Sequence, residues 1–590
     1  MSIVRTLAKS LRKYKKETII TPIFISVEVL MECTIPLLIS RIINTLEKSK
    51  NLETGSGGLL QSIIIYGLIL VAMAGISLLS GIMAAKFGSR ASAGFATNLR
   101  KDMFYNIQNF SFANIDKFST PSLVTRLTTD VTNVQQAFMM IIRIGVRAPL
   151  MMAFAMVISF TFHATLPLVF LIVVPILGSG MYLIITKAHP LFKKVFQKYD
   201  NLNNSVQENI RGMRVVKSYV RENYEINKFK KTASDVRKDF IKAERIIAFT
   251  GPLMTFCMYI CMLAISYFGA KIIISSNASA LEVGELSSLI TYSMQILSSL
   301  MMFSFVFLMC TISAESADRI AEVIREKSTI TNPENPVYEL QDGSVSFKNV
   351  SFKYSERAKR YALSNINLDI KTGETIGILG GTGSSKTSLI QLIPRLYDAT
   401  EGEVYVGSRN VKEYDLDTLR NGVAVVLQKN TLFSGTIEEN LRWGNKDATM
   451  EEIKEACQLA QAEEFIERFP EKYNTYIEQG GTNVSGGQKQ RLCIARALLK
   501  KPKILILDDS TSAVDTKTDA LIRNGLKNYL PDTTKIIIAQ RVASVENADK
   551  IVIMDNGTIN QIGTHEELLK TNKIYQEVYY SQNKVGDTNE

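Results

Sequence analysis

Two short stretches in the second half of the sequence carry residue types at a spacing suited to phosphate and metal chemistry. The first, IGILGGTGSSKTSLI (376–390), has Gly380, Gly383, Lys386 and Thr387 at the spacing of a phosphate-binding loop. In such a loop, backbone amides cradle phosphate oxygens at a helix N-terminus, the lysine neutralises phosphate charge, and the threonine hydroxyl holds Mg²⁺. A chance Gly/Ser turn is the alternative, but the apolar run before the loop and the helical pattern after it favour a nucleotide site.

The second stretch, ILILDDSTSAVD (504–515), ends a run of four apolar residues with two aspartates. The run predicts a buried strand that brings Asp508 to a metal–nucleotide site. Asp509 follows at the place where an ATP-hydrolysing protein is expected to hold the carboxylate that activates water. The shorter acidic side chain therefore stands at the position that matters for hydrolysis.

The elements that must position these residues lie in a domain predicted over 343–582. Short β-rich runs (SVSFKNVSFKY, ETIGILG, GVAVVL, KILILDD, KIIIAQR and KIVIMD) alternate there with helical stretches. This alternation predicts an α/β nucleotide-binding domain. A charged linker over 326–342 precedes it, and 583–590 is expected to be a tail.

The first 325 residues are expected to form a membrane domain. Six apolar segments are long enough to cross about 30 Å of hydrocarbon as helices. Two of the connections between them, 85–135 and 186–245, are long and have helical periodicity, so we expect the spans to continue into the cytoplasm. The six segments lie near 18–43, 59–84, 136–160, 162–185, 246–272 and 283–312.

The charge pattern orients these spans. The net charge is +11, and fifteen Lys and Arg lie in the long connection 186–245. Positive charge between apolar runs favours contact with a membrane rather than with nucleic acid. It also predicts a multi-pass plasma-membrane protein with both termini and the α/β domain in the cytoplasm. The six cysteines show no disulfide framework or metal spacing.

A third motif, NVSGGQKQR (483–491), lies between the two nucleotide motifs. Alone it could be a flexible Ser-Gly-Gly turn before a helix. Together with the other motifs, it makes the chain resemble the ATP-binding cassette (ABC) family, and in particular exporter half-transporters with six spans and one cassette. The resemblance implies a polytopic α-helical membrane domain followed by an α/β P-loop cassette. It also implies a second half-transporter, because each ATP is held between the phosphate loop of one chain and the signature of the other.

The resemblance assigns roles residue by residue. Tyr354 resembles the aromatic that stacks on adenine, and Ser512 to Asp515 resemble the loop that joins the two ATP sites. Ser385 stands where a third glycine is common, so its side chain must point away from the phosphates. The expected ATP contacts are Tyr354, Gly380, Gly381, Thr382, Gly383, Ser384, Ser385, Lys386, Thr387, Ser388, Gln428 and Asp508. The expected Mg²⁺ site is Thr387, Gln428 and Asp508, and the signature that covers the partner's ATP is Ser485, Gly486, Gly487 and Gln488.

Two positions depart from the family pattern together. Asp509 stands where the family usually has a catalytic glutamate, and Gln540 stands where it has a switch histidine. The joint change resembles the degenerate subunit of a bacterial heterodimeric transporter, which binds ATP and hydrolyses it slowly while its partner supplies the glutamate and histidine. Two alternatives stay open: a homodimeric, fully hydrolysing exporter of lipid or peptide, and a mainly regulatory ATP-binding subunit.

Other segments bear on transmission and on the substrate. FANIDKFSTPSLVTRLTTDV (112–131) and NSVQENIRGMRVVKSYVREN (204–223) are similar to exporter segments whose short transverse helices dock on cassettes. In the spans, charged pairs lie four residues apart. They either line a cavity for cationic amphipathic compounds or pair between helices. The resemblance implies export of a drug-like compound, lipid or peptide. The charged candidates are Glu28, Glu32, Arg143 and Arg147.

Overall fold

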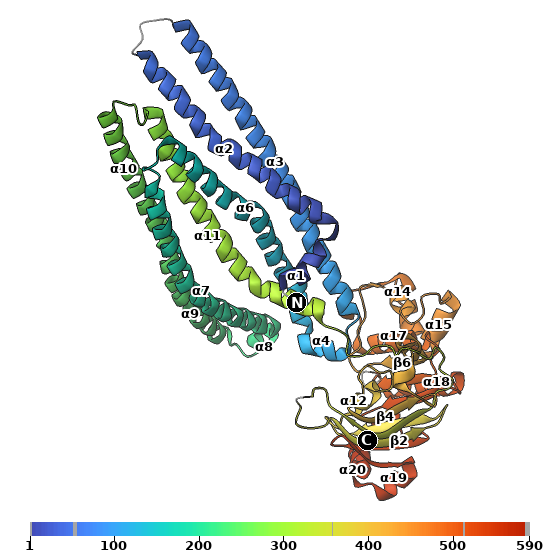
Figure 1. The fold of residues 1–590 in the computed structure, drawn as a ribbon. Helices are drawn as coiled ribbons and strands as arrows, with labels where there is room; N and C mark the ends of the chain where they lie inside the picture. The colour runs from blue at the N-terminus through green and yellow to red at the C-terminus, as the bar shows by residue number, and fades with distance from the viewer. Residues whose placement is uncertain (1–2, 51–55, 357, 511–513, 585–590) are drawn as a thin grey trace. The chain divides into compact units, whose positions relative to one another are not determined.

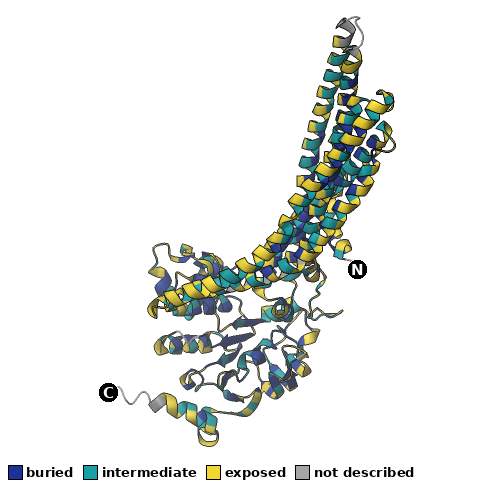
Figure 2. Ribbon diagram, turned by 90° about the vertical axis from the view of Figure 1, so that its left-hand side faces the viewer, coloured by how far each residue is buried: buried dark blue, intermediate teal, exposed yellow. Residues whose placement is uncertain are grey.

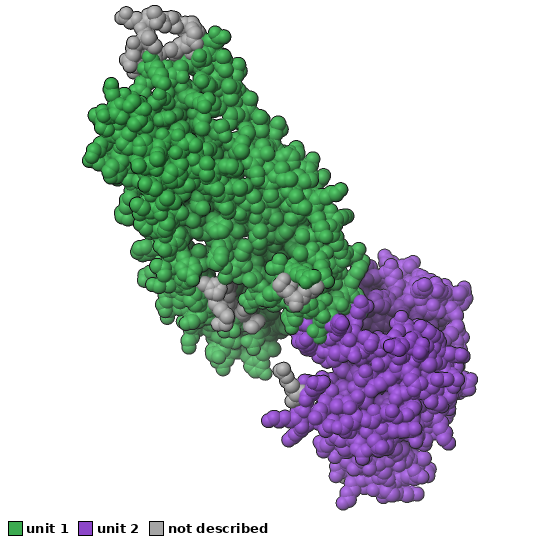
Figure 3. All heavy atoms as spheres, viewed as in Figure 1, with its two compact units in different colours: residues 1–108, 120–326 green, residues 109–119, 327–590 purple. Residues whose placement is uncertain are grey.

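The computed structural model describes residues 3–50, 56–356, 358–510 and 514–584. The chain divides into two compact units (Figure 3). Unit 1 comprises residues 1–108 and 120–326, and unit 2 comprises residues 109–119 and 327–590. Residues 109–119 therefore group with the cassette, although the sequence placed them in the membrane domain. They contain a short helix whose Ala113 packs against the core of unit 2 and whose Phe112 and Asp116 contact Tyr397.

In its described residues, unit 1 consists of helices joined by turns (Figure 1). Its main packing partners are α2 with α3 and α6, α11 with α2, α6 and α10, and α7 with α9 and α10. A π-helical turn, η2, interrupts the regular helix before α6. In order, the elements are α1 (Ile3–Ala8), η1 (Lys9–Tyr14), α2 (Lys15–Lys50), α3 (Ser56–Gln108), α5 (Thr120–Thr125), η2 (Arg126–Asp130), α6 (Val131–Phe162), α7 (Leu168–Arg211), α8 (Met213–Ser218), α9 (Glu222–Ala248), α10 (Thr250–Ser276) and α11 (Val283–Arg325).

Six of these helical segments are long and apolar enough to span a membrane, so the predicted number of spans is confirmed. The long connections are indeed helical continuations, since α3 runs to Gln108 and α7 to Arg211. Two expected spans differ in detail. The fourth was placed at 162–185, but α7 begins at Leu168, because the residues just before it form a non-helical turn. The fifth was placed at 246–272, and it crosses a helix boundary at Phe249.

Unit 2 is built on a six-stranded sheet in the order β12-β11-β3-β10-β9-β6 and a four-stranded antiparallel sheet in the order β2-β1-β4-β5. In the larger sheet β11, β3, β10, β9 and β6 are parallel. The carboxyl ends of these strands therefore lie at one edge, which is where α/β folds place their ligands. The strands are β1 (Val345–Phe352), β2 (Leu363–Ile370), β3 (Thr375–Gly380), β4 (Glu401–Val406), β5 (Arg409–Asn410), β6 (Val423–Val426), β7 (Gly435–Thr436), β8 (Tyr476–Ile477), β9 (Ile504–Asp508), β10 (Thr534–Ile538), β11 (Lys550–Asp555) and β12 (Thr558–Gly563).

In unit 2, helices pack against the six-stranded sheet, and the hydrophobic core lies between the sheet and the helices. Figure 2 shows buried residues along the cassette strands and exposed residues along the outer faces of the helices of unit 1. Exposed apolar side chains on spanning helices are expected, because lipid is their solvent. The helices of unit 2 are α4 (Phe112–Phe118), α12 (Lys386–Gln391), α13 (Leu416–Gly422), α14 (Ile437–Arg442), α15 (Met450–Leu459), α16 (Glu463–Glu467), α17 (Gly486–Leu498), α18 (Thr516–Tyr529), α19 (His565–Thr571) and α20 (Lys573–Lys584), with 3₁₀ turns η3 (Val411–Glu413), η4 (Lys472–Asn474), η5 (Gln479–Gly481) and η6 (Val542–Ser544).

Candidate ATP site

The loop between β3 and α12 has the backbone shape of a phosphate cradle. Ser385 adopts φ +68° and Gly383 φ +84°, so the loop turns through the left-handed region twice before α12 begins. Ser385 thus takes a conformation that favours glycine, as its place in the motif suggested. A Cβ on Gly380 would lie 2.2 Å from the carbonyl oxygen of Met554, whereas Gly381 faces open space. Glycine is therefore required where the loop leaves the sheet, and the rim is open to a ligand.

The Lys386 side chain folds into this loop. Its Nζ donates to the carbonyl oxygens of Gly380 at 2.8 Å and Gly381 at 2.9 Å and to Oγ of Ser384 at 3.2 Å. Burial lowers the pKa of the Lys386 ammonium, and the carboxylates of Asp508 and Asp509 act in the opposite direction. An ammonium group whose hydrogen bonds here go to two carbonyl oxygens and a hydroxyl, at the start of a helix, suits an anionic phosphate.

Two of the three predicted metal ligands, Thr387 and Asp508, lie next to one another, whereas the third, Gln428, bonds to Asp509. The hydroxyl of Thr387 donates a 2.9 Å hydrogen bond to Oδ2 of Asp508, which is the last residue of β9 and is 2% exposed. Burial raises the pKa of the Asp508 carboxyl, and the neighbouring Asp509 adds to this effect. A hydroxyl and a buried carboxylate beside the phosphate loop fit the oxygen ligands that Mg²⁺ prefers.

Asp509 stands one residue beyond β9 with φ +49°, in the left-handed region. Its Oδ2 accepts a 2.8 Å hydrogen bond from Nε2 of Gln540 and a 3.3 Å hydrogen bond from Nε2 of Gln428. Gln540 follows β10 and Gln428 follows β6, the two neighbours of β9 in the sheet. The parallel strand ends thus bring the two predicted catalytic residues, Asp509 and Gln540, together with Gln428, a predicted Mg²⁺ ligand.

The last described helix braces this region, a contact that the sequence analysis missed. The side chain of Gln582 in α20 donates to the carbonyl oxygen of Gln540 at 2.8 Å and accepts from the N–H of Val542 at 2.9 Å. A cavity of about 840 Å³ opens beside it, with Asp509 and Tyr579 among its lining residues. An exposed glutamine near the C-terminus has no motif signal, so sequence reasoning could not single it out.

Tyr354 lies at the end of β1, in an aromatic cluster of the cassette. Its hydroxyl is 2.7 Å from Oγ of Ser388 in α12, and its ring makes edge-to-face contacts with Phe352 and Tyr397. Tyr354 is 46% exposed, so part of the ring stays open to a stacking ligand. Tyr397 was not among the predicted residues, because a lone tyrosine between α12 and β4 carries no motif.

The signature begins a helix, as its sequence suggested. Ser485 is the N-cap of α17, and its side chain accepts from the N–H of Gln488 while the Gln488 side chain accepts from the N–H of Ser485. Ser485 and Gly486 are exposed. This capping box leaves the serine and glycines at a fixed, accessible helix start. Of the loop expected to join the two sites, Ser512 and Ala513 lie outside the described residues, and Asp515 caps α18.

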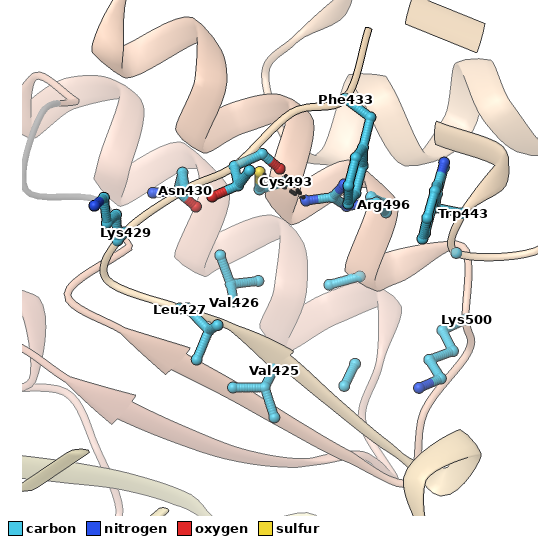
Figure 4. A pocket seen from close by; sticks show the side chains of 14 residues that line it. Val425, Val426, Leu427, Lys429, Asn430, Phe433, Trp443, Cys493, Arg496 and Lys500 are labelled. Atoms are coloured by element: carbon cyan, nitrogen blue, oxygen red, sulfur yellow. Dashed lines mark hydrogen bonds between the residues drawn. The ribbon is translucent and has the colours of Figure 1, made fainter. Parts of the chain in front are cut away.

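A separate cavity of about 350 Å³ lies between β6 and α17 (Figure 4). Its wall includes Phe433 and Trp443, whose rings stack with centroids 4.2 Å apart, and Arg496, which donates to the carbonyl oxygen of Thr431 at 3.0 Å. The Trp443 side chain is 65% exposed. None of the predicted ATP contacts lines this cavity, so it is distinct from the nucleotide site.

The charged residues of the spans pair with one another. Arg147 in α6 donates to Glu28 at 2.5 Å and to Glu32 at 2.7 Å, and both glutamates lie in α2. These three candidates thus form ion pairs between helices, which is one of the two alternatives that the sequence left open. Arg143 packs against Gly88 in α3 and has no carboxylate within ion-pair distance among the described residues.

A phosphate loop, a metal-type aspartate and a signature helix on one α/β domain, joined to six candidate spans, define a membrane protein that carries its own ATP-binding cassette. The chain belongs to the ABC transporter family. Two family models match: one described as the ABC transporter transmembrane region, over residues 18–300, and one described as ABC transporter, over residues 363–512.

Relatives of similar length support the same conclusion. The uncharacterized ABC transporter ATP-binding protein YfiB of Bacillus subtilis is 35% identical over 572 residues, which cover 97% of each chain. YgaD of the same organism, provisionally named a multidrug export ATP-binding/permease protein, is 29% identical over 99% of this chain and 100% of its own. A solved structure of a bacterial Atm1-family ABC exporter with ATP bound matches with a TM-score of 0.83 at 21% identity, over 96% of this chain and 99% of that one. The fold is therefore that of an exporter half-transporter, and the predicted fold class is confirmed.

Proposed function

We propose that the chain is the degenerate-site half of a heterodimeric ABC exporter. Its own cassette binds ATP and Mg²⁺ and hydrolyses slowly, while its signature residues Ser485 to Gln488 complete the active site of a second half-transporter. The partner supplies the catalytic glutamate and the switch histidine. The observation that carries this proposal is the state of Asp509, whose Oδ2 accepts hydrogen bonds from both Gln540 and Gln428.

The retained groups support ATP binding. Lys386 and the loop amides would hold the phosphates, and Tyr354 would stack on adenine, from the predicted set of contacts. Thr387 and Asp508, with Gln428, would hold Mg²⁺, which neutralises charge on the phosphates when bound. The loop rim at Gly381 is open, and the Thr387 hydroxyl already lies on the Asp508 carboxylate, so the residues present fit both groups.

The altered groups support slow hydrolysis. Aspartate lacks one methylene, so its carboxylate ends about 1.5 Å short of the place that a glutamate reaches. A misplacement of roughly 1 Å can cost about 100-fold in rate. In addition, Oδ2 of Asp509 is already engaged by the side-chain amides of Gln540 and Gln428, so those hydrogen bonds must break before it can accept one from a water molecule. Gln540 can donate a hydrogen bond but cannot carry a proton as histidine does.

The proposed organisation follows the sequence boundaries, except that residues 109–119 group with the cassette: a membrane domain over 1–325, a linker over 326–342, a cassette over 343–582 and a tail over 583–590. We place the protein in the plasma membrane with the cassette and both termini in the cytoplasm, as the positive charge of 186–245 indicates. The name of the relative YgaD favours an amphipathic, drug-like substrate over a polar one.

ATP turnover and oligomer mass of the chain alone in lipid nanodiscs test the proposal. We expect negligible turnover, no stable homodimer and retained binding of ATP. Brisk Mg²⁺-dependent turnover by a homodimer, abolished by Lys386→Ala, would instead establish the homodimeric, fully hydrolysing exporter as the correct reading. A mainly regulatory subunit would be indicated if a partner's turnover did not depend on Ser485 and Gly486.

A further inference from the structure

The short helix α4 is held against the cassette through Tyr397. The hydroxyl of Tyr397 donates a 2.6 Å hydrogen bond to Oδ2 of Asp116 in α4. The ring of Phe112, at the start of α4, lies with its centroid 5.9 Å from that of Tyr397. Tyr397 is 7% exposed, and burial, followed by the Asp116 carboxylate, raises the pKa of its phenol. The phenol therefore keeps its proton and remains a donor to Asp116 at every pH the cell encounters.

The same tyrosine touches the residue expected to hold adenine. The rings of Tyr397 and Tyr354 meet edge to face, with centroids 5.2 Å apart and an interplanar angle of 88°. Phe352 packs against both rings, at 5.4 Å from Tyr397 and 4.8 Å from Tyr354. Aromatic contacts of this kind favour specific relative orientations, so a base stacked on the exposed part of Tyr354 restricts both rings together.

On its other side, α4 is fixed to the segment that follows α11. Asn114, which is 1% exposed, donates to the carbonyl oxygen of Lys327 at 3.1 Å and accepts from the N–H of Thr329 at 3.2 Å. The hydroxyls of Ser111 and Thr329 lie 2.6 Å apart. The helix α4 is thus held between the aromatic cluster and the segment that leads into the cassette. A change in the position of Tyr397 therefore affects both α4 and that segment.

We propose that Tyr397 is a positioning residue that reports adenine occupancy to α4, by pairing its ring with Tyr354 and its hydroxyl with Asp116. The inference rests on the proposed function, because it takes Tyr354 as the adenine contact. The effect of the nucleotide on α4 depends on its base. A ligand held by its phosphates alone does not contact Tyr354, so Tyr354, Tyr397 and α4 stay as they are in the free protein. Tyr397 itself does not touch the reacting phosphates.

Hydrogen exchange of the α4 amides (Phe112–Phe118) in the full chain in nanodiscs tests this, with ATP or ribose 5′-triphosphate at saturation. In the unmodified chain we expect ATP to slow exchange and ribose 5′-triphosphate, which has no base, to leave it unchanged. Tyr397→Phe removes only the hydroxyl. Since hydrogen bonds to charged groups contribute about 1.5–3 kcal/mol, the ATP-induced protection should fall about tenfold or more, while ATP affinity stays within about twofold.

A matched control is Tyr405→Phe, which removes an exposed tyrosine–carboxylate bond to Glu403 elsewhere in the cassette and should behave like the unmodified chain. Asp116→Ala removes the Tyr397 bond from the other side and should reproduce the loss if Tyr397→Phe does not fold. The inference is overturned if ATP still protects the α4 amides in both Tyr397→Phe and Asp116→Ala. It is also overturned if ribose 5′-triphosphate protects these amides as much as ATP does. ATP binding is measured separately, and a chain that does not bind ATP overturns the proposed function and this inference with it.

Discussion

The side-chain amide of Gln540 donates a 2.8 Å hydrogen bond to Oδ2 of Asp509. The two residues that depart from the family pattern are therefore direct partners, and they stand on neighbouring parallel strand ends. In a competent site, histidine and glutamate at these positions would act on nucleotide and water. Here the two side chains bond to each other, and on the proposed function this pairing is why the site hydrolyses ATP slowly.

Restoring the family residues at both positions should increase hydrolysis. We expect Asp509→Glu with Gln540→His to raise ATP turnover of the assembled transporter by about 100-fold at this site, because the longer acid regains the lost methylene. Single-turnover rates measured with the partner's site inactivated would isolate the effect. The same double variant carrying Lys386→Ala is the control and should be inactive. A turnover that does not change on reversion would remove Asp509 as the cause of slow hydrolysis.

Removing the brace from α20 should loosen the segment after β10. Gln582→Ala loses two hydrogen bonds to the backbone of Gln540 and Val542, each with a net contribution of about 1 kcal/mol. We expect amide exchange over 540–544 to become about fivefold faster or more. Gln576→Ala is a matched control on the same helix, because the Gln576 side chain donates to the carbonyl oxygen of Leu569 and, among the described residues, does not bond to the segment after β10. Equal exchange in the two variants would show that Gln582 does not restrain the segment.

Breaking the charge cluster of the spans should destabilise the membrane domain. Arg147→Gln leaves Glu28 and Glu32 without their cation, and unpaired buried charges cost about 3–5 kcal/mol, less here because all three side chains are partly exposed. We expect a lower thermal unfolding midpoint in nanodiscs. The triple change Glu28→Gln, Glu32→Gln and Arg147→Gln should recover most of the loss, since no charge is then left unpaired.

Arg143→Gln is the comparison for that experiment. Arg143 has no ion-pair partner among the described residues, so its replacement should shift the midpoint less than Arg147→Gln does. If the two arginine variants lose the same stability, the ion pairs are not what stabilises this region. If the double change Glu28→Gln and Glu32→Gln abolishes export of cationic dyes without lowering the midpoint, the glutamates serve the substrate instead.

Acidification should weaken the binding of Mg²⁺–ATP. The loss should begin at a higher pH than it would if Asp508 had the pKa of an ordinary aspartate. Burial raises the pKa of the Asp508 carboxyl above its usual 3.8, and Mg²⁺ needs the ionised form. The free energy of unfolding of the nucleotide-free protein should change in the opposite direction. The Asp508 carboxyl of the folded state takes up its proton at a higher pH than that of the unfolded chain, so this group adds to stability as the pH falls.

A pH series of ATP affinity, with and without Mg²⁺, measures the first effect. The Mg²⁺-dependent part of the affinity should decline as the pH is lowered from neutral, whereas the part carried by Lys386 and the loop amides should change less. Asp508→Asn should remove the Mg²⁺-dependent part at every pH. A Mg²⁺ effect that stays constant down to the ordinary aspartate pKa would contradict a raised Asp508 pKa.

Much of this protein could be predicted from local sequence, and the exceptions have a common cause. The phosphate loop, β9 and the signature helix are each encoded within about a dozen residues, by a glycine spacing, an apolar run or a capping box. The six apolar segments could be predicted from their length. The helix start at Leu168 could not, because three of the five turn residues between α6 and α7 (Ala164, Leu166 and Pro167) are themselves apolar.

The contacts that sequence reasoning missed join segments far apart in the chain. Tyr397 meets Asp116 across 281 positions, and Gln582 meets Gln540 across 42. Arg147 and Glu28 were candidates, but whether they pair or face a cavity depends on how α2 and α6 turn about their axes. Such relations are fixed by tertiary packing, and no single sequence window contains them.

The hydrogen bonds from Gln582 have a consequence for how the chain is made. A ribosome synthesises the phosphate loop, the signature and both altered positions before it reaches α20, so the segment at Gln540 acquires its brace only after Gln582 has emerged. A protein that stops short, by proteolysis or a late stop codon, would keep every sequence motif of the family and still lack this restraint.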